Sequence, residues 1–551
     1  MKCSGAEILL QCLKKQGVDT IFGYPGGAVI PLYDALYDYR DSFFHVLTCH
    51  EQGAVHAADG YARASGRVGV CFATSGPGAT NTVTGIATAY ADSVPLVVIT
   101  GQVASSLLGR DSFQEVDITG ITMPITKHSY MARNIEKLPE IVAEAFQIAA
   151  SGRPGPVLID IPKDVFMTQI EYTDEAVVLG KPQETKKDSV DIREAAEIVN
   201  QAQRPVIYSG GGIILSEAYE ELLKLSEYGS IPVVNTLMGL GSFPRNHSLS
   251  LGMVGMHGFP EANLAVTHSD LVIAIGARFS DRVIGVVDQF APKAKVIHID
   301  ADKVEIGKNK EVHLSLVGDV KEILKALIQK VEKKSRQAWL AEIGAWKRPI
   351  QSKYDTLTAK EILTTANRMT HPDTIVTTEV GQHQMWTAQY WKFQKPRTFL
   401  SSGGLGTMGY GLGAAIGAQT AYPDQRVLHM AGDGSFRMNC NELATVAKYN
   451  LPIITILFNN GVLGMVRQWQ MHFCNERYSE TDLASTVDYI KLADAYGIRG
   501  KRVENIGDFE KALQEALQEC KPMLIECVIS KDEHVFPIVP PGKPIHDYIL
   551  E

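Results

Sequence analysis

The sequence predicts an α/β protein of three doubly wound, parallel-sheet domains. Short runs rich in Val, Ile and Leu alternate with helix-length segments, a pattern typical of parallel strands buried on both faces. The chain has 551 residues, enough for about three or four domains at roughly 100 to 200 residues each. The expected strands are VGVCFAT, PLVVIT, PVLIDI, PVIYSG, LVIAIG, KVIHID, TIVTTE, RVLHMAG, PIITILF and MLIECVIS.

The composition excludes several classes of protein. Hydrophobic residues make up 45% and charged residues 21%, which fits a globular chain and excludes a disordered or fibrous one. The net charge is −9 and the Lys and Arg residues form no stripe, so we expect no nucleic acid partner. The longest apolar runs fall far short of the roughly 20 residues that span a bilayer, so we expect no membrane partner. Eight scattered cysteines without a CxxC pair indicate a reducing, cytoplasmic location.

Two polar stretches divide the chain. We expect linkers at Tyr172 to Lys187 and at Lys330 to Tyr354, and an N-terminal amphipathic helix capped by Ser4. The first and third domains share a plan, because each has an early Gly-rich turn, then a strand ending in a Gly-containing loop, a helix and another apolar strand. The predicted units are 1–170, 188–330, 355–535 and a Pro-rich tail, 536–551.

The most informative loop is Gly432-Asp433-Gly434-Ser435, which closes the strand RVLHMAG. A helix over 441–449 and the strand PIITILF follow, and that strand ends in Asn459-Asn460-Gly461. Since neighbouring parallel strands end at one edge of a sheet, we expect Asp433 and Asn460 to lie side by side. A carboxylate, an amide oxygen and a backbone carbonyl, assigned to Val462, suit Mg²⁺ that also binds the oxygens of a diphosphate ester. The glycines allow a close approach of the backbone to the diphosphate.

Two other interpretations of this region exist. Gly404, Gly406 and Gly409 match GxGxxG, and Asp433 follows where a dinucleotide-binding acid belongs. This interpretation leaves Ser435 and Asn460 without a role, and RTFLSSGG is not a clear buried strand. Alternatively, the loops are two Asx turns at strand ends. The diphosphate interpretation accounts for the most residues.

GDGS followed by NN resembles the thiamine-diphosphate-binding motif. The segment HVLTCHEQGAVHAADGYARASG is similar to the part of such enzymes that carries a catalytic glutamate, which places that role on Glu51. Glu51 is expected in the turn between a strand over 44–48 and a helix. If Glu51 had no catalytic role, it would only favour the positive end of that helix. The buried stripe of the helix is expected at Ala54, Ala57, Ala58, Tyr61 and Ala62.

Longer segments extend the resemblance from about residue 4 to 535. Among them are FGYPGGAVIPLYDAL, ATSGPGATN, GRDSFQEVDI, GRPGPVLIDIPKDV, GMHG, GARFSDRV, GQHQMW, SGGLGTMGYG, NGVLGMVRQWQ and RYSETDL. Together they resemble the catalytic large subunit of acetohydroxyacid synthase, also called acetolactate synthase. The resemblance implies that the N-terminal domain binds the pyrimidine of thiamine diphosphate, that the C-terminal domain binds its diphosphate with Mg²⁺, and that the central domain is of the FAD-binding type.

The activity implied is a carboligation in the biosynthesis of valine, leucine and isoleucine. Pyruvate is decarboxylated on thiamine diphosphate, and the hydroxyethyl unit condenses with pyruvate to 2-acetolactate or with 2-ketobutyrate to 2-aceto-2-hydroxybutyrate. The alternatives are an FAD-independent catabolic acetolactate synthase or another thiamine-diphosphate-dependent 2-ketoacid decarboxylase or oxidase. A catalytically silent homologue is disfavoured, because it has no need of Glu51, Asp433 and Asn460 together.

The resemblance assigns a role to individual residues. Glu51 shares a proton with the coenzyme's pyrimidine, Met408 bends the coenzyme, Arg282 binds the acceptor carboxylate and Trp469 favours 2-ketobutyrate as acceptor. Gln114 and Lys163 lie near the intermediate and the site entrance. Further contacts to thiamine diphosphate are expected from Gly381, Gln382, His383, Gly406, Met408, Gly432, Gly434, Ser435, Asn460 and Gly461. Contacts to FAD are expected from Arg153, Gly210, Gly211, Gly212, Met256, His257, Arg278 and Asp300.

Two positions depart from the family pattern, namely Gly413 in place of a usual Pro and Ser280 in place of a usual Asp. The resemblance also implies a homodimer or homotetramer, because in the family the glutamate and the diphosphate motif meet across a subunit boundary. A separate small regulatory subunit is a further expected partner. The tail is expected to close over the site.

Overall fold

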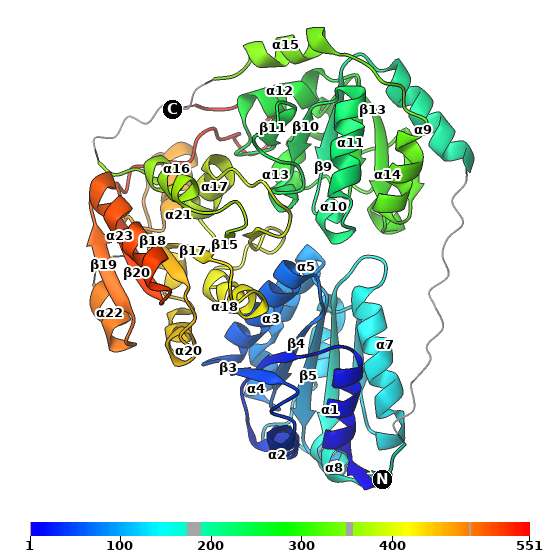
Figure 1. The fold of residues 1–551 in the computed structure, drawn as a ribbon, viewed down its shortest axis with the longest axis vertical. Coiled ribbons are helices and arrows are strands. Elements are labelled where there is room, and N and C mark those ends of the chain that lie inside the picture. Colours follow the sequence, from blue (N-terminus) through cyan, green and yellow to red (C-terminus); the bar gives the residue numbers. More distant parts are fainter. Residues whose placement is uncertain (1, 174–188, 349–355, 484–485, 551) are drawn as a thin grey trace.

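The computed structural model describes residues 2–173, 189–348, 356–483 and 486–550. Figure 1 shows domain 1 in blue to cyan, domain 2 in green, and domain 3 in yellow to red beside them. Each domain has a six-stranded, all-parallel sheet, as the sequence predicts. Almost every residue of the central strands is buried, because helices cover both faces of each sheet.

Domain 1 has the strand order β3-β2-β4-β5-β7-β6. Its strands are β2 (Thr20–Gly23), β3 (Phe44–Leu47), β4 (Gly69–Ala73), β5 (Leu96–Gln102), β6 (His128–Met131) and β7 (Pro156–Pro162). Its helices are α1 (Gly5–Lys15), α2 (Ile30–Asp38), α3 (Glu51–Ser65), α4 (Pro77–Asn81), α5 (Val83–Asp92), α6 (Ile118–Thr122), α7 (Leu138–Ala150) and α8 (Lys163–Met167). Ser4 caps α1, as predicted, in a capping box with Glu7. A short antiparallel pair, β1 (Lys2–Ser4) with β8 (Gln169–Glu171), joins the two ends of the domain.

Domain 2 has the order β11-β10-β9-β12-β13-β14, so the direction of strand addition reverses between β9 and β12. Its strands are β9 (Pro205–Ser209), β10 (Val233–Asn235), β11 (Ser250–Met253), β12 (Leu271–Ile275), β13 (Lys295–Asp300) and β14 (Leu314–Val317). Its helices are α9 (Ser189–Gln201), α10 (Gly212–Leu215), α11 (Tyr219–Gly229), α12 (Pro260–His268), α13 (Asp281–Ile284), α14 (Val320–Ile328) and α15 (Gln337–Ala345). A crevice opens where such a sheet reverses, and ligands bind there.

Domain 3 has the order β16-β15-β17-β18-β20-β19, which repeats the order of domain 1 strand for strand. Its strands are β15 (Ile375–Thr378), β16 (Phe399–Leu400), β17 (Val427–Gly432), β18 (Ile454–Asn459), β19 (Arg499–Val503) and β20 (Met523–Val528). Its helices are α16 (Ala359–Met369), α17 (Gln382–Tyr390), α18 (Gly411–Ala421), α19 (Asp433–Phe436), α20 (Leu443–Lys448), α21 (Gly464–Phe473), α22 (Tyr489–Ala495) and α23 (Ile506–Glu519). The shared plan of domains 1 and 3 is therefore confirmed.

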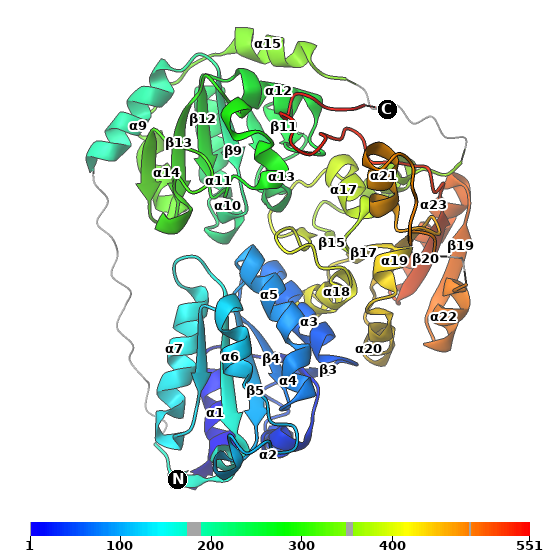
Figure 2. The ribbon, with the colours of Figure 1, turned by 180° about the vertical axis from the view of Figure 1, so that it is seen from behind.

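Helices α3 and α18 pack against each other and join domain 1 to domain 3, which both ribbon views show (Figures 1 and 2). The expected buried stripe of α3 is confirmed, and most of the remaining residues of α3 are buried as well. The two backbones approach closely at Gly60 and Gly417, where a Cβ would overlap the carbonyl oxygens of Ala414 and Ala57 respectively. Gly413 lies at the same crossing, where a Cβ would stand 2.7 Å from the Cβ of His56.

Some local expectations are wrong. The loop after β17 begins with the short helix α19, and the helix expected over 441–449 consists of a 3-10 turn and α20. The segment Lys330 to Tyr354 is not a simple linker, because it contains α15, whose Trp339 is buried against domain 2. RTFLSSGG does contain a buried strand, the two-residue β16. Most of the other expected linker lies outside the described residues.

The close crossing predicts a strong effect of one added methyl group. Gly417→Ala should lower the free energy of unfolding by about 1–3 kcal/mol, because the Cβ overlaps the backbone of α3. Gly344→Ala is the matched control, since Gly344 lies in α15 with no atom within 4 Å of its Cβ position. This control should be neutral or stabilising. Thermal unfolding measures both, and an unchanged Tm for Gly417→Ala would contradict the crossing.

Candidate functional site

Asp433 and Asn460 lie side by side at the ends of two neighbouring strands. Strands β17 and β18 pair in parallel, and Asp433 follows the first while Asn460 follows the second. The Asp433 carboxylate accepts the N–H of Gly461 at 2.9 Å and that of Gly434 at 3.0 Å. The Asn460 amide oxygen accepts the N–H of Val462 at 3.2 Å. Burial raises the pKa of Asp433 to about 6, so a cation or several N–H donors are needed to stabilise its charge.

A histidine with an unsatisfied nitrogen faces this loop. His383 lies in the first turn of α17 and is buried, and its Nε2 atom has no hydrogen-bond partner. A Cβ on Gly432 would stand 2.7 Å from His383 Nδ1, so only glycine allows this approach. Burial lowers the pKa of His383 to about 4, so the ring is neutral at pH 7. A buried imidazole that packs on a glycine-lined loop and keeps its Nε2 unpaired can donate a hydrogen bond to an oxygen of a phosphate ester.

Gly381 and Gln382 connect the same turn to the Asn460 loop. Gly381 has a φ of 151° and directly precedes α17. The Gln382 side-chain oxygen accepts a hydrogen bond from the Asn460 amide at 3.2 Å. In the described parts of the chain no three His, Cys, Asp or Glu side chains gather as a metal site. The loop offers one carboxylate with amide and backbone oxygens, and such a set suits Mg²⁺ when phosphate oxygens complete the coordination.

The loop that carries Met408 is held from two domains. Gly406 has a φ of 72°, and Met408 is half-buried. The Asp92 carboxylate of domain 1 accepts the N–H groups of Gly403 and Gly404 at 3.1 and 2.7 Å. The loop runs from β16 to α18, the context that a dinucleotide motif needs. However, β15 separates β16 from β17, so Asp433 does not end the adjacent strand, and the dinucleotide interpretation fails on this point.

Glu51 is buried in domain 1. It is the first residue of α3 rather than part of the preceding turn, and 8% of it is exposed. Its carboxylate accepts a hydrogen bond from the Asn81 amide at 2.9 Å, and a Cβ on Gly78 would stand 3.1 Å from its Oε1. The Glu442 carboxylate of domain 3 accepts the N–H groups of Cys49 and His50, each at 3.0 Å, and thereby fixes the turn before Glu51.

Gln114 lies near the same loop of domain 1. It has a φ of 61°, and a Cβ on Gly76 would stand 2.8 Å from its Cβ. The neighbouring backbone is held by Gln102, whose amide donates to the Val116 carbonyl at 2.8 Å and to the Asp160 carboxylate at 3.0 Å. The structure thus brings Gln114 to the loop that also contacts Glu51.

Lys163, by contrast, is the half-buried first residue of α8, which follows β7.

Arg282 of domain 2 meets Trp469 of domain 3. The Arg282 guanidinium lies 5.7 Å from the Trp469 ring, and its side chain is 64% exposed. The Ser280 hydroxyl caps α13 by accepting the N–H of Arg282 at 3.2 Å. Ser280 stands where the family pattern has Asp, and it still supplies an oxygen that caps the helix. The tail packs beside this pair, since the Val539 N–H donates to the Met256 carbonyl at 2.8 Å. Residues of the tail and of α13 together line a hollow next to Arg282.

The residues expected to contact FAD surround the crevice of domain 2. Gly210, Gly211 and Gly212 follow β9, and a Cβ on Gly210 would overlap the Gly276 carbonyl oxygen at the point of strand reversal. Met256, His257, Arg278 and Asp300 also lie at or just beyond the carboxyl ends of strands. Burial raises the pKa of Asp300 to about 6.

Two arginines tie this crevice to domain 1. Arg153 of domain 1 reaches Glu305 at 2.8 Å, and Arg278 donates to the Ala91 carbonyl at 2.6 Å.

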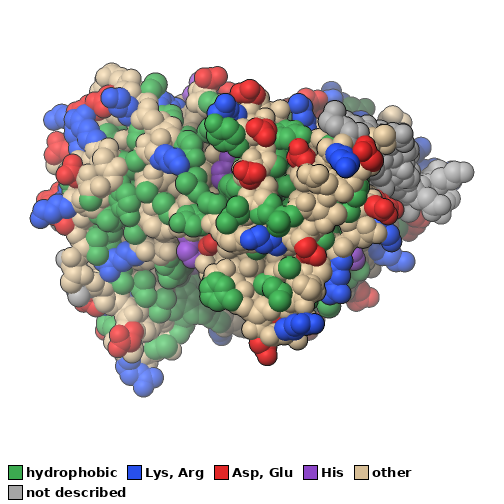
Figure 3. Space-filling view, turned by 90° about the horizontal axis from the view of Figure 1, so that it is seen from below, with side chains coloured by type: hydrophobic (Ala, Val, Ile, Leu, Met, Phe, Trp, Pro, Cys, Tyr) green, Lys and Arg blue, Asp and Glu red, His purple; other side chains and the backbone are tan. Residues whose placement is uncertain are grey.

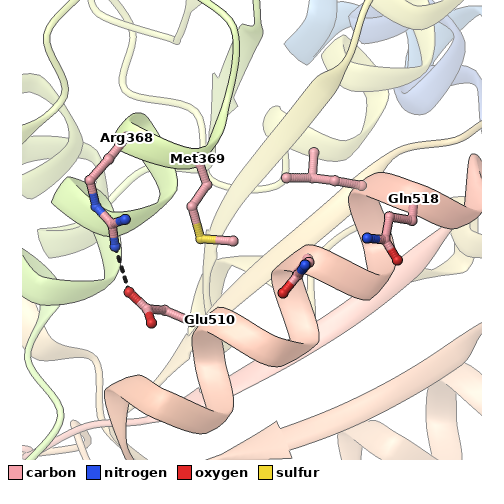
Figure 4. A pocket seen from close by; sticks show the side chains of 6 residues that line it. Arg368, Met369, Glu510 and Gln518 are labelled. Carbon is pink, nitrogen blue, oxygen red and sulfur yellow. Dashed lines mark hydrogen bonds and ion pairs between the residues drawn. The ribbon is translucent and has the colours of Figure 1, made fainter.

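A further groove lies between α16 and α23, away from these loops. Figure 4 shows its ion pair between Arg368 and Glu510, with Met369 and Gln518 beside it. None of the residues that we expected in the site lines this groove.

Sequence reasoning missed three carboxylates that hold the site in place, namely Asp92, Glu379 and Glu442. A signal was present only for Glu379, because it is an acidic residue placed directly after a buried strand.

Comparison with protein families places the chain in a known class. The models of the thiamine pyrophosphate enzyme N-terminal TPP binding domain, central domain and C-terminal TPP binding domain match residues 3–121, 192–327 and 379–527. Thiamine pyrophosphate is thiamine diphosphate, so the chain is a thiamine-diphosphate-dependent enzyme.

The full-length relatives define the family more closely. The chain is 48% identical to the probable acetolactate synthase large subunit of Methanocaldococcus jannaschii, over 98% of this chain and 94% of the relative. It is 48% identical to the acetolactate synthase large subunit of Parasynechococcus marenigrum and 47% identical to the acetolactate synthase of Mycobacterium bovis, in each case over 98% of this chain and 90% of the relative. The chain belongs to the acetolactate synthase family. Among its described helices, none has the length and apolar character needed to cross a membrane.

The buried pair Asp160 and Gln102 gives a prediction about pH. Burial raises the pKa of Asp160 to about 7, so the folded protein keeps a proton that the unfolded chain loses above about pH 4. Stability should therefore fall as the pH rises from about 4 to 7 and change little above that. Asp160→Asn should flatten this slope, because an amide does not titrate in this range. The fold should tolerate the change, since the amide can accept from Gln102 and donate to Thr100. Tm measured against pH tests this, and equal slopes in both proteins would rule it out.

Proposed function

We propose that this enzyme decarboxylates pyruvate on thiamine diphosphate and condenses the two-carbon unit with pyruvate or 2-ketobutyrate, giving 2-acetolactate or 2-aceto-2-hydroxybutyrate. One observation carries the proposal of the coenzyme site. Asp433 and Asn460 lie at one glycine-lined edge of the domain 3 sheet, and the ring of the buried His383, whose Nε2 has no hydrogen-bond partner, packs against Gly432 at the same edge. Asp433, Asn460 and the Val462 carbonyl are the proposed Mg²⁺ ligands. When bound, the coenzyme supplies the ring that stabilises the carbanion.

The protein's own residues orient the coenzyme and move the proton. Glu51, buried at the start of α3, holds the proton exchanged with the coenzyme's pyrimidine. Met408, on a loop held by Asp92, supports the bent shape of the coenzyme. The backbone carbonyl of Gly406, a residue with a left-handed conformation, is the proposed acceptor for the coenzyme's pyrimidine. Gln114, which packs against Gly76 of the loop beside Glu51, is the proposed neighbour of the reaction intermediate.

The acceptor is recognised where domains 2 and 3 meet. The exposed Arg282 guanidinium binds the carboxylate of the second ketoacid through two parallel hydrogen bonds. Trp469 packs beside Arg282 and contacts the acceptor's alkyl group. One methylene in an apolar pocket is worth about 1–3 kcal/mol, which is enough to favour 2-ketobutyrate over pyruvate. Lys163 stands at the entrance to the site.

We also propose that FAD binds in the crevice of domain 2, across the glycine turn after β9. The close packing of Gly210 on Gly276 at the strand reversal supports a site for a dinucleotide there. The alternative activities differ in their use of flavin. A colourless, fully active protein would favour an FAD-independent acetolactate synthase, and flavin reduction by pyruvate would favour an oxidase.

The active enzyme is proposed to be at least a homodimer. The Glu51 carboxylate is held within domain 1 and the Asp433 carboxylate within domain 3, and the resemblance to acetohydroxyacid synthase implies that these two residues meet across a subunit boundary. Leu405 and Met438 are 48% and 60% exposed beside the coenzyme loops, which suits an interface. Figure 3 shows apolar side chains gathered on the face that is seen from below.

Two further features of the protein's setting belong to the proposal. Relatives are named large subunits, so we propose a small regulatory subunit as a further partner. All eight cysteines are free, which supports a reducing, cytoplasmic location.

Glu51→Gln tests the proposed chemistry. The variant should lose about 10²- to 10⁴-fold in kcat for acetolactate formation, because the amide cannot exchange the proton. Activity of the wild type should depend on added thiamine diphosphate and Mg²⁺. Glu221→Gln, a change of a buried glutamate in α11 of domain 2, is the control and should keep wild-type activity. Undiminished activity of Glu51→Gln would refute the assigned role.

A further inference from the structure

Glu379 is a buried carboxylate that no step above uses. It follows β15, and 1% of it is exposed. One of its oxygens, Oε2, accepts the N–H of Gly409 and the hydroxyl of Ser435, each at 2.7 Å. The other, Oε1, accepts the N–H of Leu412 at 3.1 Å and lies 3.3 Å from His429 Nε2. One carboxylate therefore joins three separate segments of domain 3.

Two of these segments are the coenzyme loops. Gly409 directly follows Met408, and Ser435 belongs to the loop of Asp433. The Ser435 hydroxyl also accepts the N–H of Gly409 at 3.1 Å, so its one donor hydrogen and one of its two acceptor positions are used within the protein. The hydroxyl hydrogen of Ser435 is therefore not free for a phosphate oxygen of the coenzyme. Leu412 lies in the first turn of α18, so the same carboxylate also caps the helix that packs on α3.

The electrostatics favour an ionised Glu379. Burial by itself raises the pKa of a carboxyl group, but the hydrogen bonds from His429 and Ser435 hold the pKa of Glu379 below its ordinary value. A buried carboxylate with four donors is strongly held, whereas its removal leaves N–H groups without a partner. The Glu379 carboxylate therefore holds Gly409, Leu412 and Ser435 at fixed distances from one another.

We propose that Glu379 is a positioning residue that locks the Met408 loop to the diphosphate loop before the coenzyme binds. The inference rests on the coenzyme site proposed above. Met408 is placed at the centre of the coenzyme and the Asp433 loop at its diphosphate, so their separation decides whether both contacts form together. A misplacement of about 1 Å can cost about 100-fold in an oriented reaction.

Hydrogen exchange in the coenzyme-free protein tests the lock directly. Glu379→Gln presents an amide group to N–H donors, so it should speed exchange at Gly409 and Leu412 and around Ser435. Glu533→Gln is the matched control, because Glu533 is a buried glutamate of the same domain whose carboxylate accepts the N–H of Ala359 at 3.0 Å. This control should change exchange only at the start of α16.

Binding of thiamine diphosphate, followed by tryptophan fluorescence with Mg²⁺ present, is the second measurement. Glu379→Gln should raise the Kd by at least about tenfold, and Glu533→Gln should leave it unchanged. Unaltered exchange at Gly409 and Leu412, or an unchanged Kd, would overturn the proposal. Hydrogen exchange is measured without turnover. A failure of the lock can therefore be distinguished from a failure of the proposed acetolactate synthase activity.

If Glu379→Gln does not fold, Glu379→Asp keeps the charge but is one methylene too short to reach both loops, and the same results are expected. The wild type alone also decides the matter. Fast exchange of the Gly409 and Leu412 amides in the coenzyme-free protein, near the rate of a free peptide, would show that no lock exists.

Discussion

The contact between α3 and α18 is the constraint on which the rest of the site depends. Two helices can approach so closely only where one of them lacks a side chain, and Gly60 and Gly417 supply these positions. Helix α3 begins with Glu51, and α18 directly follows the Met408 loop. Within one chain the contact therefore orients two groups that the proposed dimer uses at different sites, the proton-transferring residue of one coenzyme site and the Met408 loop of the other. Carboxylates then secure both ends, Glu442 at the turn before α3 and Glu379 at the start of α18.

The contact also reflects the repeated plan of domains 1 and 3. Gly60 of α3 packs on Ala414 of α18, and Gly417 of α18 packs on Ala57 of α3, so the contact is nearly symmetric. The symmetry matches Gly60 with Gly417 and Ala57 with Ala414, two pairs that are equally far apart in the sequence. The same separation matches Glu51 with Met408. Equivalent positions of two similar domains thus carry residues with different proposed roles. One transfers a proton, and the other holds the shape of the coenzyme. The central domain has a different strand order and presents a crevice of its own.

Local pattern was sufficient to predict the fold class and the Asp433 loop. Buried parallel strands have a strong signature in sequence, and the rule that their carboxyl ends meet at one edge places Asp433 beside Asn460. The roles of Glu51, Arg282 and Trp469 came from family resemblance instead. Sequence did not reveal the bonds from Asp92 to Gly404 or from Glu442 to Cys49, because these residues are more than 300 positions apart. The hydrophobic periodicity of a sequence carries no information about such distant pairs. Strand β16 was not expected because it has two residues, too few to show a periodic pattern.

The central claim is that Glu51 of one copy and Asp433 of another serve a single coenzyme. Coexpression of Glu51→Gln with Asp433→Asn, each inactive alone, tests it most directly. In a mixed dimer one of the two sites then contains both native residues, so random pairing should restore about one quarter of wild-type acetolactate formation. If both residues served a site within one chain, no site in the mixture would be intact. A mixture as inactive as either variant alone would contradict the account.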